Sequence, residues 1–214
     1  MNTFKRGIIV PGLIASVALG LVFFEPDRGT TILLAAVTGT MLLLAGVRWL
    51  HLLPVALLGV AAMAVSIFFL HDAMRSGRID AWLHPQEHLT GVARPAAPAT
   101  IALGAGGLTG LGLGDGRQKL GFVSAIQSDF IFANIGEELG LVATGLVVLA
   151  FLLIAITGLF IALHARDQFG CLLAVGVTSL ISFQAIINIG VVTSLLPNKG
   201  LALPFISSGG SSLL

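Results

Sequence analysis

Long apolar runs separated by short polar breaks make up most of this chain. An α-helix needs about 20 mostly apolar residues to cross the hydrocarbon core of a bilayer, where every backbone polar group must be bonded internally. The pattern therefore predicts five full transmembrane helices plus a truncated sixth. The runs are residues 7–24, 29–47, 49–70, 139–163 and 170–196, with the sixth at 201–214.

The break at residues 71–138 is far longer than the others, and it predicts a large loop between the third and fourth helices. Lys and Arg residues in short connections mark the cytoplasmic side of a membrane protein. This side is expected to carry Lys5, Arg6, Arg48 and Arg166. The long loop is then extracytoplasmic, and the short turns at 25–28 and 197–199 share its side.

The composition indicates a membrane protein. Hydrophobic residues make up 56% of the 214 positions, charged residues 10%, and the mean hydropathy is +1.02. A water-soluble domain of this size could not bury so much apolar surface in one core. A net charge of +1 without a run of Lys or Arg disfavours nucleic-acid binding. We expect an all-α membrane protein, a polytopic helical bundle, with residues 1–214 in a single membrane domain.

Proline and glycine dominate the second half of the long loop. The sequence Arg-Pro-Ala-Ala-Pro at 94–98 is not expected to form a regular helix, because proline removes a backbone donor and restricts the preceding residue. Seven glycines follow within residues 104–116, and such a backbone can bend closely around a ligand. No Walker lysine and no strand–helix context accompany them, which disfavours nucleotide binding.

Asp129 is the candidate catalytic residue, because it ends the long loop just before the apolar run at 130–133. A carboxylate at such a boundary is costly to hold partly desolvated, which favours a functional role. The alternative is that Asp129 only caps the helix that follows it. The loop at 71–138 is therefore expected to carry the active site.

Several other polar residues need partners. Gln184 and Asn188 lie four apart on one helix face and should meet protein or a watery cavity, with interhelical hydrogen bonds favoured over substrate contact. Glu137 and Glu138 are expected to open the fourth span, where the helix dipole favours anions. No histidine has a partner at metal-ligand spacing, so the sequence predicts no protein metal site.

Arg28 and Lys199 are cations on the predicted outer side, where Lys and Arg are uncommon in short connections. Their placement suggests an anion to bind. The alternative is local pairing, for example of Arg28 with Asp27 or Glu25.

Several distinctive motifs follow one another along the chain. They are Glu-Pro-Asp-Arg-Gly-Thr-Thr at 25–31, Gly-Leu-Gly-Leu-Gly at 110–114, Gln-Lys-Leu at 118–120, Ser-Asp-Phe-Ile-Phe-Ala at 128–133, Gly-Glu-Glu-Leu-Gly at 136–140, and the tail at 196–212. Their order resembles the SEDS family of bacterial cell-wall proteins (FtsW, RodA, SpoVE), and the similarity covers nearly the whole chain. The Pro-x-Lys-Gly form at 197–200 is more similar to the FtsW branch than to the RodA branch. The resemblance implies family members with roughly twice as many spans, so the chain is expected to correspond to their C-terminal half.

The resemblance implies a peptidoglycan glycosyltransferase that polymerises lipid II into glycan strands by inverting transfer, in cell division and cell-shape control. In that family the aspartate of the motif at 128–133 is essential, and it maps onto Asp129. A carboxylate there can take the proton of the acceptor's 4-hydroxyl as it attacks the donor's anomeric carbon. Cations would steady the departing lipid diphosphate. The candidate substrate-binding residues are Lys119, Lys199, Arg28, Glu138 and Ser207.

The resemblance also implies a class B penicillin-binding transpeptidase and other divisome proteins as partners, and the bacterial inner (cytoplasmic) membrane as the location. It implies a divalent cation, Mg²⁺ or Mn²⁺, and no organic cofactor. Two alternatives stay open: a lipid II flippase, in which Gln184 and Asn188 line a path, and a scaffold that recruits the transpeptidase. We expect the chain on its own to be inactive, because groups such as Gln184 would face lipid.

Overall fold

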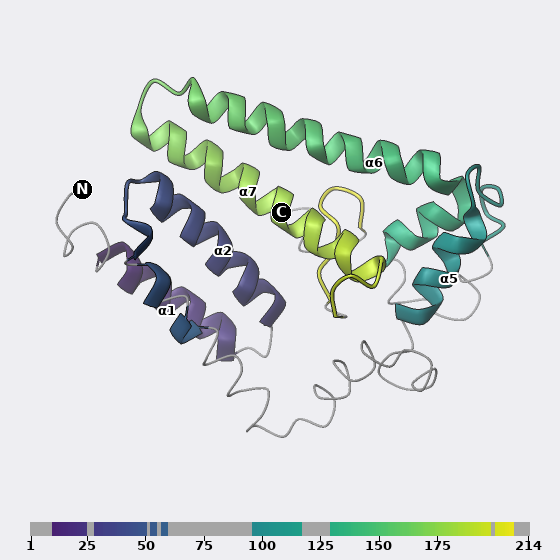
Figure 1. The fold of residues 1–214 in the computed structure, drawn as a ribbon, viewed down its shortest axis with the longest axis horizontal. Helices are drawn as coiled ribbons and strands as arrows, with labels where there is room; N and C mark the ends of the chain where they lie inside the picture. Colours follow the sequence, from purple (N-terminus) through teal and green to yellow (C-terminus); the bar gives the residue numbers. More distant parts are fainter. Residues whose placement is uncertain are drawn as a thin grey trace. The chain divides into compact units, whose positions relative to one another are not determined.

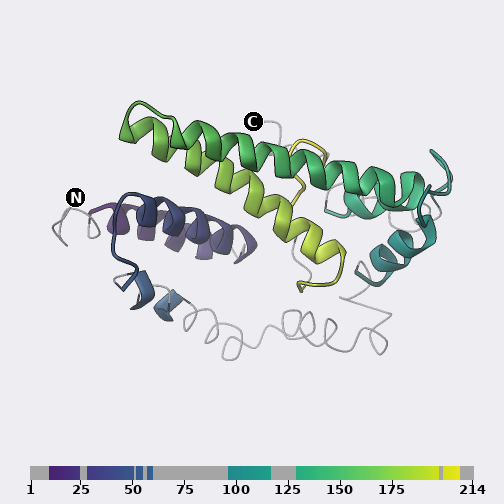
Figure 2. The same cartoon turned by 45° about the horizontal axis from the view of Figure 1, so that its top comes forward.

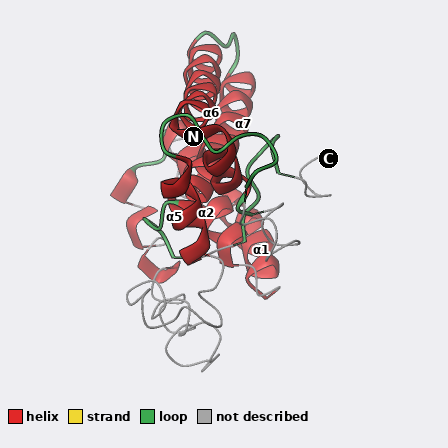
Figure 3. Ribbon diagram, turned by 90° about the vertical axis from the view of Figure 1, so that its right-hand side faces the viewer, coloured by secondary structure: helices red, strands yellow, loops and turns green. Residues whose placement is uncertain are grey.

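The computed structural model describes residues 10–24, 28–50, 52–54, 57–59, 96–116, 129–197 and 200–207. Within these ranges the chain is helical and contains no strand (Figure 3), which confirms the predicted all-α class. The helices are α1 (Val10–Phe24), α2 (Arg28–Leu44), α5 (Ala96–Gly106), α6 (Ile131–Leu163) and α7 (Gln168–Val192) (Figure 1).

The chain divides into two compact units, each built from two separate stretches. Unit 1 comprises Met1–Phe69 and Leu153–Phe183, and unit 2 comprises Leu70–Leu152 and Gln184–Leu214. Helices α6 and α7 therefore each contribute one end to unit 1 and the other end to unit 2.

Unit 1 is a set of closely packed helices. Its helices α1 and α2 lie side by side (Figure 2). A Cβ added at Gly158 of α6 would overlap the side chain of Thr178 in α7, and one added at Gly176 of α7 would lie 3.1 Å from Sδ of Met41 in α2. Small residues at such contacts let helix backbones approach closely, as is typical of helices in membranes.

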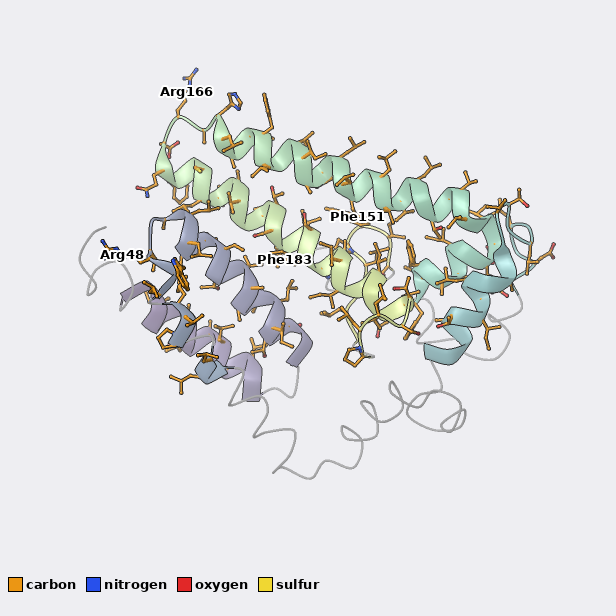
Figure 4. The ribbon with its side chains drawn as sticks, in the orientation of Figure 1. Arg48, Phe151, Arg166 and Phe183 are labelled. Carbon is orange, nitrogen blue, oxygen red and sulfur yellow. The ribbon has the colours of Figure 1, made fainter. Side chains whose placement is uncertain are left out.

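Two exposed arginines lie at one end of unit 1. Arg48 follows α2, Arg166 lies in the turn between α6 and α7, and both are exposed at the end where α6 stops and α7 starts (Figure 4). Asp167 forms the N-cap of α7, because its Oδ2 accepts a 3.0 Å hydrogen bond from the backbone N–H of Gly170. The shared position of Arg48 and Arg166 fits the prediction that both face the same side of the membrane.

The predicted spans agree with the helices to different degrees. Helices α1, α2 and α7 match the predicted runs at 7–24, 29–47 and 170–196 within a few residues. Most of the predicted span at 49–70 lies outside the described residues. Among the described helices, α6 and α7 are long and apolar enough to cross a membrane, and Gly29–Leu44 is apolar but shorter.

Three predictions about helix boundaries were wrong. Helix α6 begins at Ile131 instead of 139, because a break inside it separates a first, loop-side part from the apolar span. Helix α5 includes Pro98, which stands in its first turn, where the missing backbone donor has no helical partner to lose. Residues 201–207 are not helical, so the predicted sixth helix does not begin at 201.

Residues 201–207 form a tight turn instead. The Ser207 Oγ accepts a hydrogen bond of 2.7 Å from the Leu203 N–H, and the Ser207 N–H donates to the Leu203 carbonyl at 3.0 Å. Pro204 supplies no donor for a helix, and Phe205 has a left-handed φ of 64°. The backbone polar groups here are therefore bonded by local and side-chain partners.

Candidate active site

The site in unit 2 is organised around a break in α6. Gly140 has φ 75° and ψ −171°, which interrupts the helix. In a straight helix the N–H groups of Leu141 and Val142 would donate to the carbonyls of Glu137 and Glu138, four residues earlier. The break separates these donors from these acceptors, so all four groups need other partners.

The glycine-rich segment after α5 supplies those partners. Its residues 107–112 lie along the break and replace one turn of helical hydrogen bonding. Two of its N–H groups donate to α6, and two of its carbonyls accept from α6. The bonds are Leu111 N to Glu137 O (3.0 Å), Gly112 N to Glu138 O (3.0 Å), Leu141 N to Gly107 O (2.9 Å) and Val142 N to Leu108 O (3.4 Å).

Glycine is required where the two backbones meet. A Cβ at Gly106 would overlap the carbonyl of Gly136, and one at Gly110 would overlap the carbonyl of Glu138. Gly110 and Gly140 both have positive φ, at 82° and 75°, which L side chains rarely adopt. The glycine run was expected to bend closely around a ligand, and the structure shows its residues 107–112 lying against the break in α6.

Glu137 and Glu138 lie at the break and are buried, with 2% and 8% of their surfaces exposed. A Cβ at Gly116 would lie 3.2 Å from Oε2 of Glu137 and 3.0 Å from Oε1 of Glu138, so both carboxylates face the end of the glycine-rich segment. The prediction that they open a helix at its N-terminus was wrong. They end the first part of α6 instead, so the helix dipole does not explain their position.

Asp129 stands immediately outside the N-terminal end of α6. Helix α6 starts at Ile131, and the carbonyl of Phe130 accepts from the N–H groups of Ala133 at 3.0 Å and Asn134 at 3.3 Å. Phe130 therefore occupies the N-cap position, one residue inside Asp129. The half-buried Asp129 side chain reaches residue 200, because its Oδ2 would lie 2.9 Å from a Cβ at Gly200.

Asn188 joins two distant segments to the C-terminal part of α7. Its Nδ2 donates to the main-chain carbonyl of Asp129 at 2.8 Å and to that of Leu201 at 2.5 Å. One helical turn earlier, Gln184 Nε2 donates to the carbonyl of Ala202 at 2.9 Å. The prediction that both amides face protein is confirmed, and their acceptors are backbone carbonyls of non-helical segments.

The remaining candidate residues are placed as follows. Ser207 is buried, and its Oγ accepts the Leu203 N–H. Arg28 begins α2 in unit 1, and its side chain lies outside the described part of the structure. Lys119 and Lys199 also lie outside it, although Lys199 directly precedes Gly200 in sequence. In the described ranges no group of three or more His, Cys, Asp or Glu residues could hold a metal ion.

The whole chain is similar to known sequences. All residues, 1–214, match a family model described as "Cell cycle protein", whose name combines FtsW, RodA and SpoVE. The chain belongs to this family. Family membership, together with its apolar helices, makes it an integral membrane protein.

Curated relatives favour the FtsW branch, as the sequence predicted. A "Probable peptidoglycan glycosyltransferase FtsW" of Trichlorobacter lovleyi is 41% identical over 100% of this chain and 56% of its own length. Another protein of that name, from Escherichia coli, is 38% identical over 98% of this chain and 51% of its length. The "Stage V sporulation protein E" of Bacillus subtilis is 38% identical over 100% and 58%. The chain thus spans about half the length of the curated relatives it matches.

A solved structure shares the fold. The structure titled "Structural coordination of polymerization and crosslinking by a peptidoglycan synthase complex" superposes with a TM-score of 0.72 at 23% identity. The match covers 95% of this chain and 56% of that one. This similarity supports the helical arrangement, and the family membership rests on the sequence.

Proposed function

We propose that the complete protein carrying this chain is a peptidoglycan glycosyltransferase that polymerises lipid II into glycan strands. The observation that carries the proposal is the placement of Asp129. Its main-chain carbonyl is held by Asn188, and its carboxylate lies against Gly200 at the edge of α6. Relatives named as probable peptidoglycan glycosyltransferases support the reaction class.

Asp129 acts as the general base. It takes the proton from the 4-hydroxyl of the acceptor sugar as that oxygen attacks the anomeric carbon of the donor. The new bond joins the acceptor oxygen to the anomeric carbon, and the bond from that carbon to the lipid diphosphate breaks. Attack occurs opposite the leaving group, so the configuration at the anomeric carbon inverts. A single carboxylate suffices because the diphosphate leaves as an anion and needs no general acid.

Positive charge is needed where the diphosphate leaves. Preorganised cations stabilise charge that develops in the transition state, and the candidates are Lys119, Lys199 and Arg28. Lys199 is adjacent in sequence to Gly200, against which Asp129 lies. Glu138 and Ser207 stay proposed substrate-binding residues, although Ser207 also holds the turn at 201–207.

A divalent cation is a further proposal for the same step. The described residues offer no set of three carboxylate, thiol or imidazole ligands, so they do not form a complete metal site. Mg²⁺ often uses one or two carboxylates and completes its coordination with water and substrate phosphates. Polymerisation that continues unchanged in EDTA would rule out its participation.

The location and partners follow from the same proposal. We place the protein in the bacterial inner membrane as a multi-pass protein, with the loop at 71–138 outside. Its partner is a class B penicillin-binding transpeptidase among other divisome proteins. A fold shared with a chain of a solved peptidoglycan synthase complex supports such an association.

The test compares two aspartates in the complete gene product. Asp129→Asn removes the base with little change in shape, and we expect glycan synthesis from fluorescent lipid II to fall to background. Asp167→Asn is the matched control, because asparagine also caps helices well and Asp167 belongs to unit 1, at the α6–α7 turn. Long glycan strands made by the Asp129→Asn protein would refute the proposed role.

The same variants address the two alternatives. A lipid II flippase would scramble lipid II across liposomes without making polymer. Neither the unchanged protein nor Asp129→Asn would then give a glycan product. Its supposed path residues, Gln184 and Asn188, donate to backbone carbonyls instead, which lessens support for this reading. A scaffold would still sustain cell division with Asp129→Asn, whereas the enzyme would not.

A further inference from the structure

Asn188 connects three parts of unit 2 that are far apart in sequence. It belongs to α7, and its amide group bonds to the backbone beside the start of α6 and to the backbone of residues 200–207. Both acceptors are main-chain carbonyls, those of Asp129 and Leu201. A single side chain with two donors therefore fixes the distance between the backbones that carry Asp129 and Gly200.

Gly200 completes this arrangement from the other side. An added Cβ there would lie 2.9 Å from Oδ2 of Asp129, closer than Cβ atoms normally approach another atom. A side chain at residue 200 would therefore displace the Asp129 carboxylate from its observed position.

The chemistry of Asn188 also distinguishes it from a simple packing residue. It is 2% exposed, and its Oδ1 is buried without a hydrogen-bond partner among the described residues. An apolar side chain of similar shape would avoid the cost of that unmatched acceptor, but it would leave the carbonyls of Asp129 and Leu201 without their donor. What asparagine supplies at this position is therefore the connection between these two backbones.

We propose that Asn188 is a positioning residue, which with Gly200 sets where the Asp129 carboxylate meets the acceptor hydroxyl. This proposal rests on the role of Asp129 in the proposed function. A base must lie within hydrogen-bond reach of the proton it removes, and a displacement of about 1 Å can cost on the order of 100-fold in rate. Losing the two hydrogen bonds of Asn188 should therefore lower kcat. Substrate binding depends on other contacts and should persist.

Gln184 offers a matched control for Asn188. Both amides lie on the same face of α7, one turn apart, and both donate to the backbone of residues 200–207. Asn188 also bonds to the carbonyl of Asp129, whereas among the described residues Gln184 donates to the carbonyl of Ala202. Asn188→Leu and Gln184→Leu each remove one anchor of residues 200–207, and Asn188→Leu alone also releases Asp129.

The experiment measures kcat and KM for lipid II polymerisation in the complete gene product with its transpeptidase partner. We expect Asn188→Leu to lower kcat by about 100-fold with KM changed less than about threefold, and Gln184→Leu to lower kcat by less than about tenfold. Equal losses in the two variants, or a loss confined to KM, would overturn the positioning role. A melting temperature for each purified variant identifies any that fails to fold.

Gly200→Ala provides a second variant that leaves both amides intact. It places a methyl group against the Asp129 carboxylate, so kcat should again fall by at least about tenfold with KM little changed. Should Asn188→Leu fail to fold, normal kcat in Gly200→Ala would overturn the proposal. Activity in Asp129→Asn would defeat the proposed function itself, whereas an inactive Asp129→Asn with fully active Asn188→Leu and Gly200→Ala would defeat only this inference.

Discussion

Two glycines in α6 differ in whether the surrounding structure requires glycine at their positions. Gly140 has a left-handed φ, and an added Cβ would overlap the backbone of Leu108 and Gly110. Gly145, five residues later on the same helix, has open space around the position of a Cβ. The first glycine is needed to break the helix, and the second is not required by any described contact.

Gly140→Ala should therefore destabilise the protein. An L residue in the left-handed region costs about 1–2 kcal/mol, and the overlap with the glycine-rich segment adds to this cost. Gly145→Ala should be neutral or should stabilise by up to about 1 kcal/mol, because alanine favours helix over glycine. Thermal unfolding of the purified variants in detergent measures both. Equal melting temperatures for the two variants would contradict the role given to the break.

Sequence reasoning singled out Asp129 as the candidate catalytic residue, but it could not identify the residues that contact it. A lone carboxylate before an apolar run stands out by its chemistry, so its position could be predicted. Its partner Asn188 lies 59 residues away, and no local pattern links the two. Gln184 and Asn188 could be assigned to a protein-facing surface because lipid cannot satisfy amides, but their acceptors depend on tertiary structure.

At the scale of elements, apolar periodicity predicted helix bounds reliably where the backbone N–H and C=O groups of a helix bond to one another. Helices α2 and α7 do so, and their bounds were predicted within a few residues. Periodicity failed where other segments supply hydrogen bonds: at the break in α6, bonded by residues 107–112, and at residues 201–207, bonded by Gln184 and Asn188. The available signal was the pair of glycines four residues apart, at 136 and 140, with two glutamates and a leucine between them.

The packing of α6 against α7 in unit 1 gives a prediction at this scale. Gly158→Ala should destabilise by about 1–3 kcal/mol, because its Cβ would overlap Thr178 and close-packed cores resist added volume. Thr178→Ala in the same protein should restore most of the loss. Thermal unfolding of the two single variants and the double variant gives the coupling between the sites. Strictly additive effects would show that the two helices do not meet through this pair.

At the scale of the whole molecule, the orientation of α6 in the membrane decides which side carries the site. Residues 141–163 rise about 1.5 Å each as a helix, which matches the roughly 30 Å thickness of the hydrocarbon core. The exposed residues Asp115 and Arg166 come before and after this stretch. Lipid II polymerisation on the outer face requires Asp115 outside, and the positive-inside tendency requires Arg166 inside.

Cysteine labelling tests this orientation in a background with Cys171→Ser, since Cys171 is the one cysteine of the sequence. A membrane-impermeant maleimide should label Asp115→Cys in intact spheroplasts and should label Arg166→Cys only after permeabilisation. The background protein without a cysteine controls for unspecific labelling. Equal labelling of both sites in intact spheroplasts would show that α6 does not cross the membrane. The reverse pattern would place Asp129 on the cytoplasmic side, where a polymerase of outer-leaflet lipid II could not use it.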